Sequence, residues 1–259
     1  MGMGSAAFAD CLPNPPVAST PVTCTGPTVG GLTISSYTTV NIGSGASLTA
    51  DVGDAAAFTT TSTSGAFYAT TAFLNVDGVV DGASASGVLV SSGPTAAYPG
   101  TQLYIKVGQG GTIEGATAVQ VVGTPGNTYG RASASLDNSG VVQSTSGSAL
   151  VAANPSLTGF TTVNNRVGGY IGGINGVVEN LTNAGTIDGG TDSAYTYAST
   201  NNFGFFPYSI TNSGVMRSNG AGATIDLPTG ATITNSGQIT NSGTGLAIGS
   251  GRGLNLQND

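Results

Sequence analysis

Residues 233–251 read ITNSGQITNSGTGLAIGSG, a stretch without a charge or an aromatic ring in which Asn-Ser-Gly occurs twice. Its first seven residues have the form aliphatic-x-Asn-small-Gly-x-aliphatic. The same form recurs, strictly or loosely, at residues 74–80, 107–113, 136–142, 181–187 and 210–216. A second short alternating segment follows each copy, such as ATAVQVV or GATIDLP. The stretch is therefore one unit of an internal repeat that holds two or three short strands.

The spacing of the repeats predicts the fold class. The shared glycine of the phrase falls at Gly78, Gly111, Gly140, Gly185, Gly214 and Gly237, at intervals of 23 to 45 residues. Such intervals, without helical periodicity, are typical of a β-solenoid in which each coil is one repeat. The 45-residue interval then holds two coils, the intermediate one carried by residues 167–173. We predict an all-β chain that forms a parallel β-helix of about ten coils.

The alternative fold is an antiparallel sandwich or barrel, because Asn-Gly corners also close hairpins. The longer phrase, with an aliphatic residue on each side and at solenoid spacing, favours the β-solenoid. In that fold, Ile, Val and Leu are expected to point into the coil, while Thr, Ser and Gln point to water.

Asparagine and glycine are predicted to form the corners of the coils. Asn tolerates left-handed backbone angles, and Gly adopts them without a steric penalty. Stacked Asn amides at successive corners can also form a ladder of hydrogen bonds. The predicted corner residues are Asn138, Gly140, Asn183, Gly185, Asn212, Gly214, Asn235 and Gly237.

Charge excludes some classes of partner. Charged residues make up 7% of the chain, the formal net charge is −7, and five residues are Lys or Arg. Five Lys and Arg side chains are too few to neutralise a run of phosphates. We therefore expect no nucleic-acid binding. The chain has no apolar run of about 18 residues, so we expect no transmembrane helix in it.

The N-terminal segment predicts export. Residues 1–9 end in AFA, the A-x-A pattern that signal peptidase cuts, although a positive n-region is missing. We interpret them as the tail of an export signal, the alternative being residues added ahead of the natural chain. The only cysteines, Cys11 and Cys24, flank a Pro-rich segment. An even pair in an exported chain predicts a disulfide, and the alternative is two free thiols.

The remaining chain divides into a cap and a solenoid. Residues 10–40 are predicted to form an N-terminal cap, and residues 41–259 the coils of the β-helix. No comparable polar cap is visible at the other end, where residues 252–256 read as another solenoid strand. We therefore expect either that the natural chain continues or that this end pairs with another molecule.

The AFA triplet, the early pair Cys11 and Cys24, and coils of the ITNSG and LTNAG type together resemble the passenger region of autotransporters (type V secretion) of the alphaproteobacterial type. The resemblance covers about residues 10–259. It implies a right-handed parallel β-helix that is exported through the periplasm and is extracellular or displayed on the bacterial cell surface. It also implies a role in adhesion, aggregation or biofilm formation.

The residues offer little for catalysis. Without histidine, the chain has no Ser-His-Asp triad, no Cys-His pair and no ordinary zinc site. Two Asp pairs, Asp77/Asp81 and Asp188/Asp192, are the candidates for the paired carboxylates of a glycan-cleaving site. Each adjoins Gly, which is typical of turn aspartates. We therefore expect no enzyme and no cofactor. We also expect no metal, since calcium-binding loop patterns are absent.

One aromatic segment breaks the pattern. Residues 196–210 read TYASTNNFGFFPYSI. Its rings either fill the core or form a contact loop. The five aromatic residues are Tyr197, Phe203, Phe205, Phe206 and Tyr208.

The function we expect is that of a secreted or cell-surface β-helix with a structural or adhesive role. Its partners would be copies of itself, because exposed strand ends pair readily, and coil-on-coil addition would build a filament. A cell-surface or glycan ligand would be a further partner. The alternative function is a glycan-binding or glycan-cleaving β-helix of the tailspike or polysaccharide-lyase type.

Overall fold

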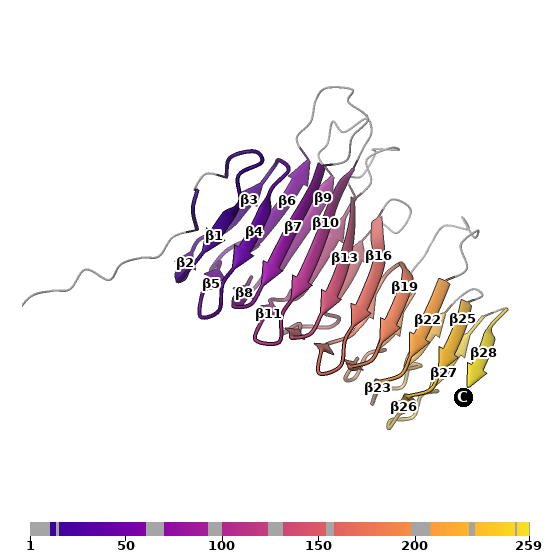
Figure 1. The fold of residues 1–259 in the computed structure, drawn as a ribbon. Coiled ribbons are helices and arrows are strands. Elements are labelled where there is room, and N and C mark those ends of the chain that lie inside the picture. The colour runs from indigo at the N-terminus through magenta and orange to yellow at the C-terminus, as the bar shows by residue number, and fades with distance from the viewer. Residues whose placement is uncertain are drawn as a thin grey trace, which may run out of the picture.

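The computed structural model describes residues 11–13, 16–60, 70–92, 100–123, 132–153, 158–197, 208–227, 231–251 and 253–258. These residues form 28 strands and no helix. All pairing between the strands is parallel, and strands three apart in the chain are hydrogen-bonded neighbours. The chain is therefore a right-handed parallel β-helix, as predicted, and Figure 1 shows its coils stacked from one end to the other.

Three sheets run the length of the solenoid. Sheet A contains β1 (Val22–Cys24), β4 (Thr39–Ile42), β7 (Thr70–Val76), β10 (Thr101–Val107), β13 (Ala132–Asn138), β16 (Thr158–Asn165), β19 (Val178–Asn183), β22 (Tyr208–Asn212), β25 (Ala231–Asn235) and β28 (Asn255–Asn258). Sheet B contains β2 (Pro27–Val29), β5 (Ser47–Thr49), β8 (Val79–Asp81), β11 (Thr112–Glu114), β14 (Val141–Val142), β17 (Tyr170–Ile171), β20 (Thr186–Asp188), β23 (Val215–Ser218) and β26 (Gln238–Asn241). Sheet C contains β3 (Leu32–Ile34), β6 (Ala56–Thr60), β9 (Ser86–Ser92), β12 (Thr117–Val122), β15 (Leu150–Ala153), β18 (Ile174–Asn175), β21 (Tyr195–Thr196), β24 (Ile225–Leu227) and β27 (Ile248–Ser250).

Each coil takes one strand from each sheet. Coil 1 is β1 to β3, coil 9 is β25 to β27, and β28 begins coil 10. The 45-residue interval in the repeat holds two coils, as predicted. Val141 after Gly140 pairs with Tyr170 after Gly169, and Tyr170 pairs with Thr186 after Gly185.

The core is a set of aliphatic columns. Val40, Leu74, Ile105 and Leu136 occupy one register position in successive strands of sheet A, and all are buried. Between them, alternate residues point to solvent, as in β13, where Ser133, Ser135 and Asp137 are only half-buried. This period of two is the pattern that the sequence predicts. Each inward side chain packs on its equivalents about 4.8 Å above and below, along the stacking direction.

Glycine is required at the corner between sheets A and B for a reason that differs from the prediction. The expected left-handed angles are wrong: Gly140, Gly185, Gly214 and Gly237 do not have positive φ, and neither do the corner asparagines. Instead, a Cβ at any of these glycines would approach the backbone of the preceding coil closer than 3.0 Å. At Gly214 the obstructing atom is the carbonyl oxygen of Gly185. Close stacking of coils, not local backbone conformation, selects glycine.

The first coil is tied to the segment before it. Cys11 and Cys24 form a disulfide, and both residues are buried. Next to this bond, Leu12 and Thr23 pair in the antiparallel direction. Cys24 is also the last residue of β1, so the disulfide anchors the segment directly to sheet A.

We predict that Gly214→Ala lowers the free energy of unfolding by about 2 kcal/mol or more, because overpacking forces the backbones of two coils apart. Gly222→Ala is the matched control. Its nearest neighbour would be the Oγ atom of Ser193 at 3.7 Å, which is ordinary contact. Urea unfolding followed by circular dichroism measures both, and equal stability of the two variants would contradict the explanation.

Candidate functional site

The predicted corner asparagines form a buried ladder inside the solenoid. The Nδ2 atom of each donates to the Oδ1 atom of the next at 2.7 to 2.9 Å. The ladder consists of Asn138, Asn165, Asn183, Asn212, Asn235 and Asn258. These residues share one register position of sheet A. The side chains thus point inward, and the asparagines serve the stack of coils rather than the turn alone.

The ladder is satisfied beyond its own bonds. The Nδ2 atom of Asn138 also donates to the carbonyl oxygen of Tyr170, the first residue of the sheet B strand in the next coil. Asn183 donates in the same way to Val215 at 3.1 Å. At the start of the ladder, the Oδ1 atom of Asn138 accepts a hydrogen bond from the backbone N–H of Gly140. In the preceding coil, Val107 occupies the register position of Asn138, and its side chain has no hydrogen-bond donor. The ladder can therefore begin at coil 5 without an unsatisfied acceptor.

The ladder includes two residues that were not predicted from the sequence, Asn165 and, at its last rung, Asn258. Asn165 stands four residues before Gly169, whereas Asn138 stands two residues before Gly140. The two additional residues lie in the turn, where Val167 is exposed. These two inserted residues change the spacing between Asn165 and Gly169, so the segment does not match the repeated Asn-small-Gly phrase although both residues are present.

We predict that Asn183→Ala lowers the free energy of unfolding by about 2–4 kcal/mol, because it removes two ladder hydrogen bonds, from Asn165 and to Asn212, and leaves a cavity in a buried column. Thr182→Ala, at the exposed neighbouring position of the same strand, should change it by less than about 0.5 kcal/mol. Denaturant titration measures both. A loss no larger than that of the control would show that the ladder does not stabilise the coils.

The two candidate carboxylate pairs are not brought together as dyads. Asp77 lies in the turn before β8, and Asp81 is the last residue of that strand. The Oδ1 atom of Asp81 accepts the backbone N–H of Ala83 at 2.7 Å, which is a turn role. In the other pair, the Oδ1 atom of Asp188 accepts the N–H of Gly190. The side chain of Asp192 forms no hydrogen bond or ion pair with the described residues.

Asp188 also belongs to a charged group on sheet B. Arg217 lies next to it in register and donates to its Oδ2 atom at 2.8 Å. Tyr170 is half-buried in the neighbouring coil. Burial and the Asp188 carboxylate raise the pKa of Tyr170, while Arg217 opposes the shift. The Asp188 carboxylate is thus paired with Arg217 rather than with Asp192.

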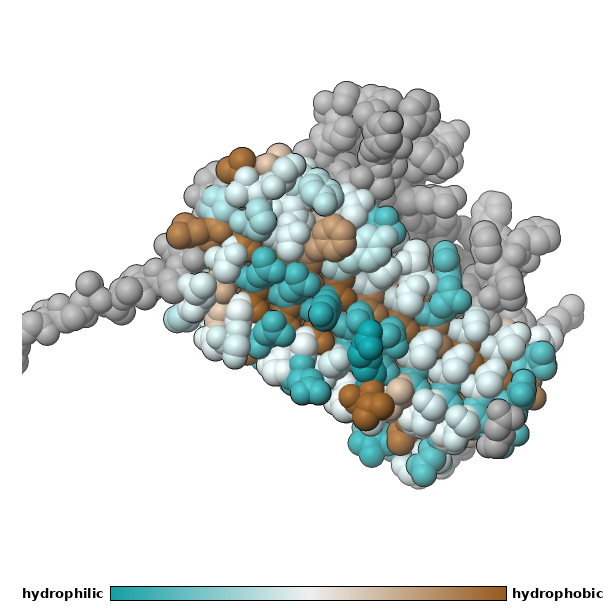
Figure 2. All heavy atoms as spheres, viewed as in Figure 1, coloured by the Kyte–Doolittle hydropathy of each residue, from teal (hydrophilic) through white to brown (hydrophobic). Residues whose placement is uncertain are grey.

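A second ion pair lies on the outer face of sheet A. Asp137 accepts hydrogen bonds from the guanidinium of Arg166 and, at 3.1 Å, from the Nδ2 atom of Asn164. The Asp137 carboxylate raises the pKa of Arg166. Lys106 is the register partner of Asp137 in the preceding coil, and its side chain is exposed. Figure 2 shows these central strands as a band of hydrophilic side chains, followed by a paler surface over the later strands of sheet A.

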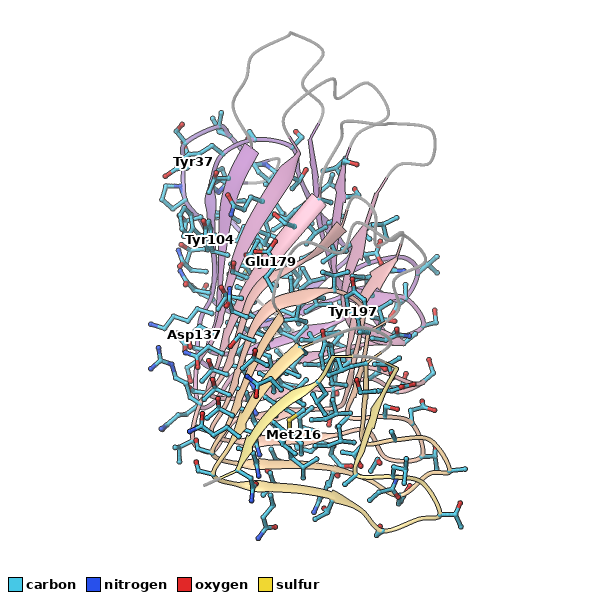
Figure 3. The ribbon with its side chains drawn as sticks, turned by 90° about the vertical axis from the view of Figure 1, so that its right-hand side faces the viewer. Tyr37, Tyr104, Asp137, Glu179, Tyr197 and Met216 are labelled. Atoms are coloured by element: carbon cyan, nitrogen blue, oxygen red, sulfur yellow. A yellow bond between two sulfur atoms is a disulfide. The ribbon has the colours of Figure 1, made fainter. Side chains whose placement is uncertain are left out.

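An aromatic row on the same face was missed by the sequence analysis. Phe73 and Tyr104 pair in register, and their rings stack with centroids 5.3 Å apart. Tyr37 meets Phe73 edge-on, with centroids 6.3 Å apart. Tyr37 and Tyr104 are 54% and 39% exposed, so the row is a surface feature. In Figure 3, Tyr37, Tyr104 and Asp137 lie along one side of the solenoid.

Only part of the predicted contact loop falls on the described residues. Tyr197 is 9% exposed and follows β21, so it belongs to the core, on the side away from the aromatic row (Figure 3). Tyr208 is the first residue of β22. Phe203, Phe205 and Phe206 lie outside the described residues.

A polar slot of about 510 Å³ opens over coils 5 to 8, where the chain passes from sheet B to sheet C. Turn residues of coils 5 and 7, among them Ser146 and Asp192, form its sides. Outward residues of sheet C, Val151, Asn175 and Thr196, form its floor. Within the part of the chain that the structure describes, no three His, Cys, Asp or Glu residues are grouped to hold a metal ion.

No helix of the described chain has both the length and the apolar character needed to cross a bilayer. Comparisons of the sequence with protein-family models and with curated proteins, and of the fold with solved structures, give no match.

Proposed function

We propose that this protein is an exported, non-enzymatic β-helix with a structural or adhesive role, and that it associates with copies of itself through the outer face of sheet A. The observation that carries the proposal is the character of this face. It is a continuous ten-stranded surface with an exposed aromatic row at one end and mainly hydroxyl and amide side chains beyond it.

The size of the face supports pairing with a second copy. Ten strands of about five residues cover roughly 700 Å², close to the roughly 800 Å² per partner of a standard interface. Two identical faces meet in an isologous contact, with the same residues on both sides. The low charge of the chain also supports association, because desolvating hydroxyls and amides that find partners costs less than desolvating charges.

Other observations support export and a non-catalytic role. The Cys11–Cys24 disulfide suits an oxidising compartment, as the predicted export signal requires. Asp81 and Asp188 form hydrogen bonds in turns, and Asp188 also pairs with Arg217. The proposal that the chain is an autotransporter passenger rests on the sequence resemblance together with this export reading and the parallel β-helix.

We predict that the weight-average mass of the full chain rises with concentration in sedimentation velocity. The double substitution Tyr37→Ser and Tyr104→Ser should weaken association about tenfold or more, because aromatic side chains are common anchors of protein interfaces. Val52→Ser with Leu246→Ser is the matched control, since both residues are exposed but lie in turns between sheets B and C. A wild-type chain that stays monomeric at every concentration would contradict the proposal.

A further inference from the structure

The polar slot exists because one turn is short. Between sheets B and C, coil 5 uses residues 143–149 and coil 7 uses residues 189–194, but coil 6 uses only Gly172 and Gly173. Coils stack about 4.8 Å apart, so the longer turns on either side stand about 10 Å apart over the short one. The Oδ2 atom of Asp192 lies 3.9 Å from where a Cβ on Gly147 would stand, so the carboxylate reaches across coil 6. The slot is thus framed by coils 5 to 7, and Gly222 of coil 8 completes its lining.

The lining is rich in groups that both donate and accept hydrogen bonds. Hydroxyls come from Ser146 and Ser148 on one side and from Thr191 and Ser193 on the other. The floor adds the amide of Asn175. Hydroxyls and amides suit a ligand that itself carries many hydroxyls. The volume lies within the roughly 300–1,000 Å³ of small-molecule sites, which is room for a short oligosaccharide.

The charge of the lining selects among such ligands. Among the described residues that line the slot, Asp192 is the only charged one. A carboxylate accepts strong hydrogen bonds from sugar hydroxyls but repels carboxylate or sulfate groups. An extended peptide fits less well, because β15, β18 and β21 at the floor are each paired on both sides and leave no free strand edge.

We infer that this slot binds a neutral oligosaccharide, with Asp192 accepting hydrogen bonds from the ligand hydroxyls. The site lies on the turns between sheets B and C, apart from the outer face of sheet A. Its ligand and self-association are therefore separate properties, and either can fail without the other.

The test uses the full chain and neutral trisaccharides of glucose, galactose and mannose, with a trimer of galacturonate as the charged counterpart. Binding is measured by saturation-transfer difference NMR and calorimetry. Asp192→Ala removes the charged acceptor, and Val151→Phe fills the floor of the slot. Asp51→Ala is the control for Asp192→Ala, because Asp51 is an exposed Asp in the equivalent turn of coil 2. Leu89→Phe is the control for Val151→Phe, because Leu89 and Val151 lie in the same outward row of sheet C.

We expect at least one neutral trisaccharide to bind, and Asp192→Ala to weaken that binding about tenfold or more, as for a hydrogen bond to a charged group. Val151→Phe should reduce binding by at least as much, while both controls bind like the wild type. Thermal unfolding verifies that each variant is folded. The inference is overturned if no neutral trisaccharide binds, if binding survives both slot substitutions, or if the galacturonate trimer binds as tightly as the neutral sugars.

Discussion

The asparagine ladder is the interaction on which the later coils depend. From Asn138 to Asn235 each amide is buried, and each receives its acceptor from the coil that follows. An unsatisfied buried amide costs about 1–3 kcal/mol, so a coil out of register is penalised at this position before any aliphatic contact is counted. A slip of one residue would also turn the side chain to solvent. The ladder therefore aligns the strands of sheet A, and the stacking glycines beside it hold adjacent coils close.

A fixed interior leaves the turns free to vary. Coil 6 has a longer turn than its neighbours between sheets A and B and a much shorter one between sheets B and C, yet Asn165 keeps its place in the ladder. The long turn brings Arg166 to Asp137, and the short turn opens the polar slot. Variation in turn length thus creates surface features without disturbing the core, which is why binding residues concentrate on loops.

The repeated phrase was sufficient to predict the parallel β-helix, the extra coil in the long interval and a ladder of asparagines. It could not explain the glycines, because their constraint is a carbonyl oxygen in a different coil, which the local sequence does not contain. The row of Tyr37, Phe73 and Tyr104 was missed because these residues are more than 30 positions apart and meet only through strand register. The slot was missed because it arises from residues that coil 6 lacks.

All the side-chain hydrogen bonds of the ladder point the same way, from the Nδ2 donor in one coil to the Oδ1 acceptor in the next. A completed coil therefore presents an open N–H group to the chain that has yet to fold onto it, so the stack is a template that extends in one direction. Before the ladder begins, coil 1 is secured by its disulfide. The molecule is thus suited to folding coil by coil, from the first rung of the ladder toward the later coils.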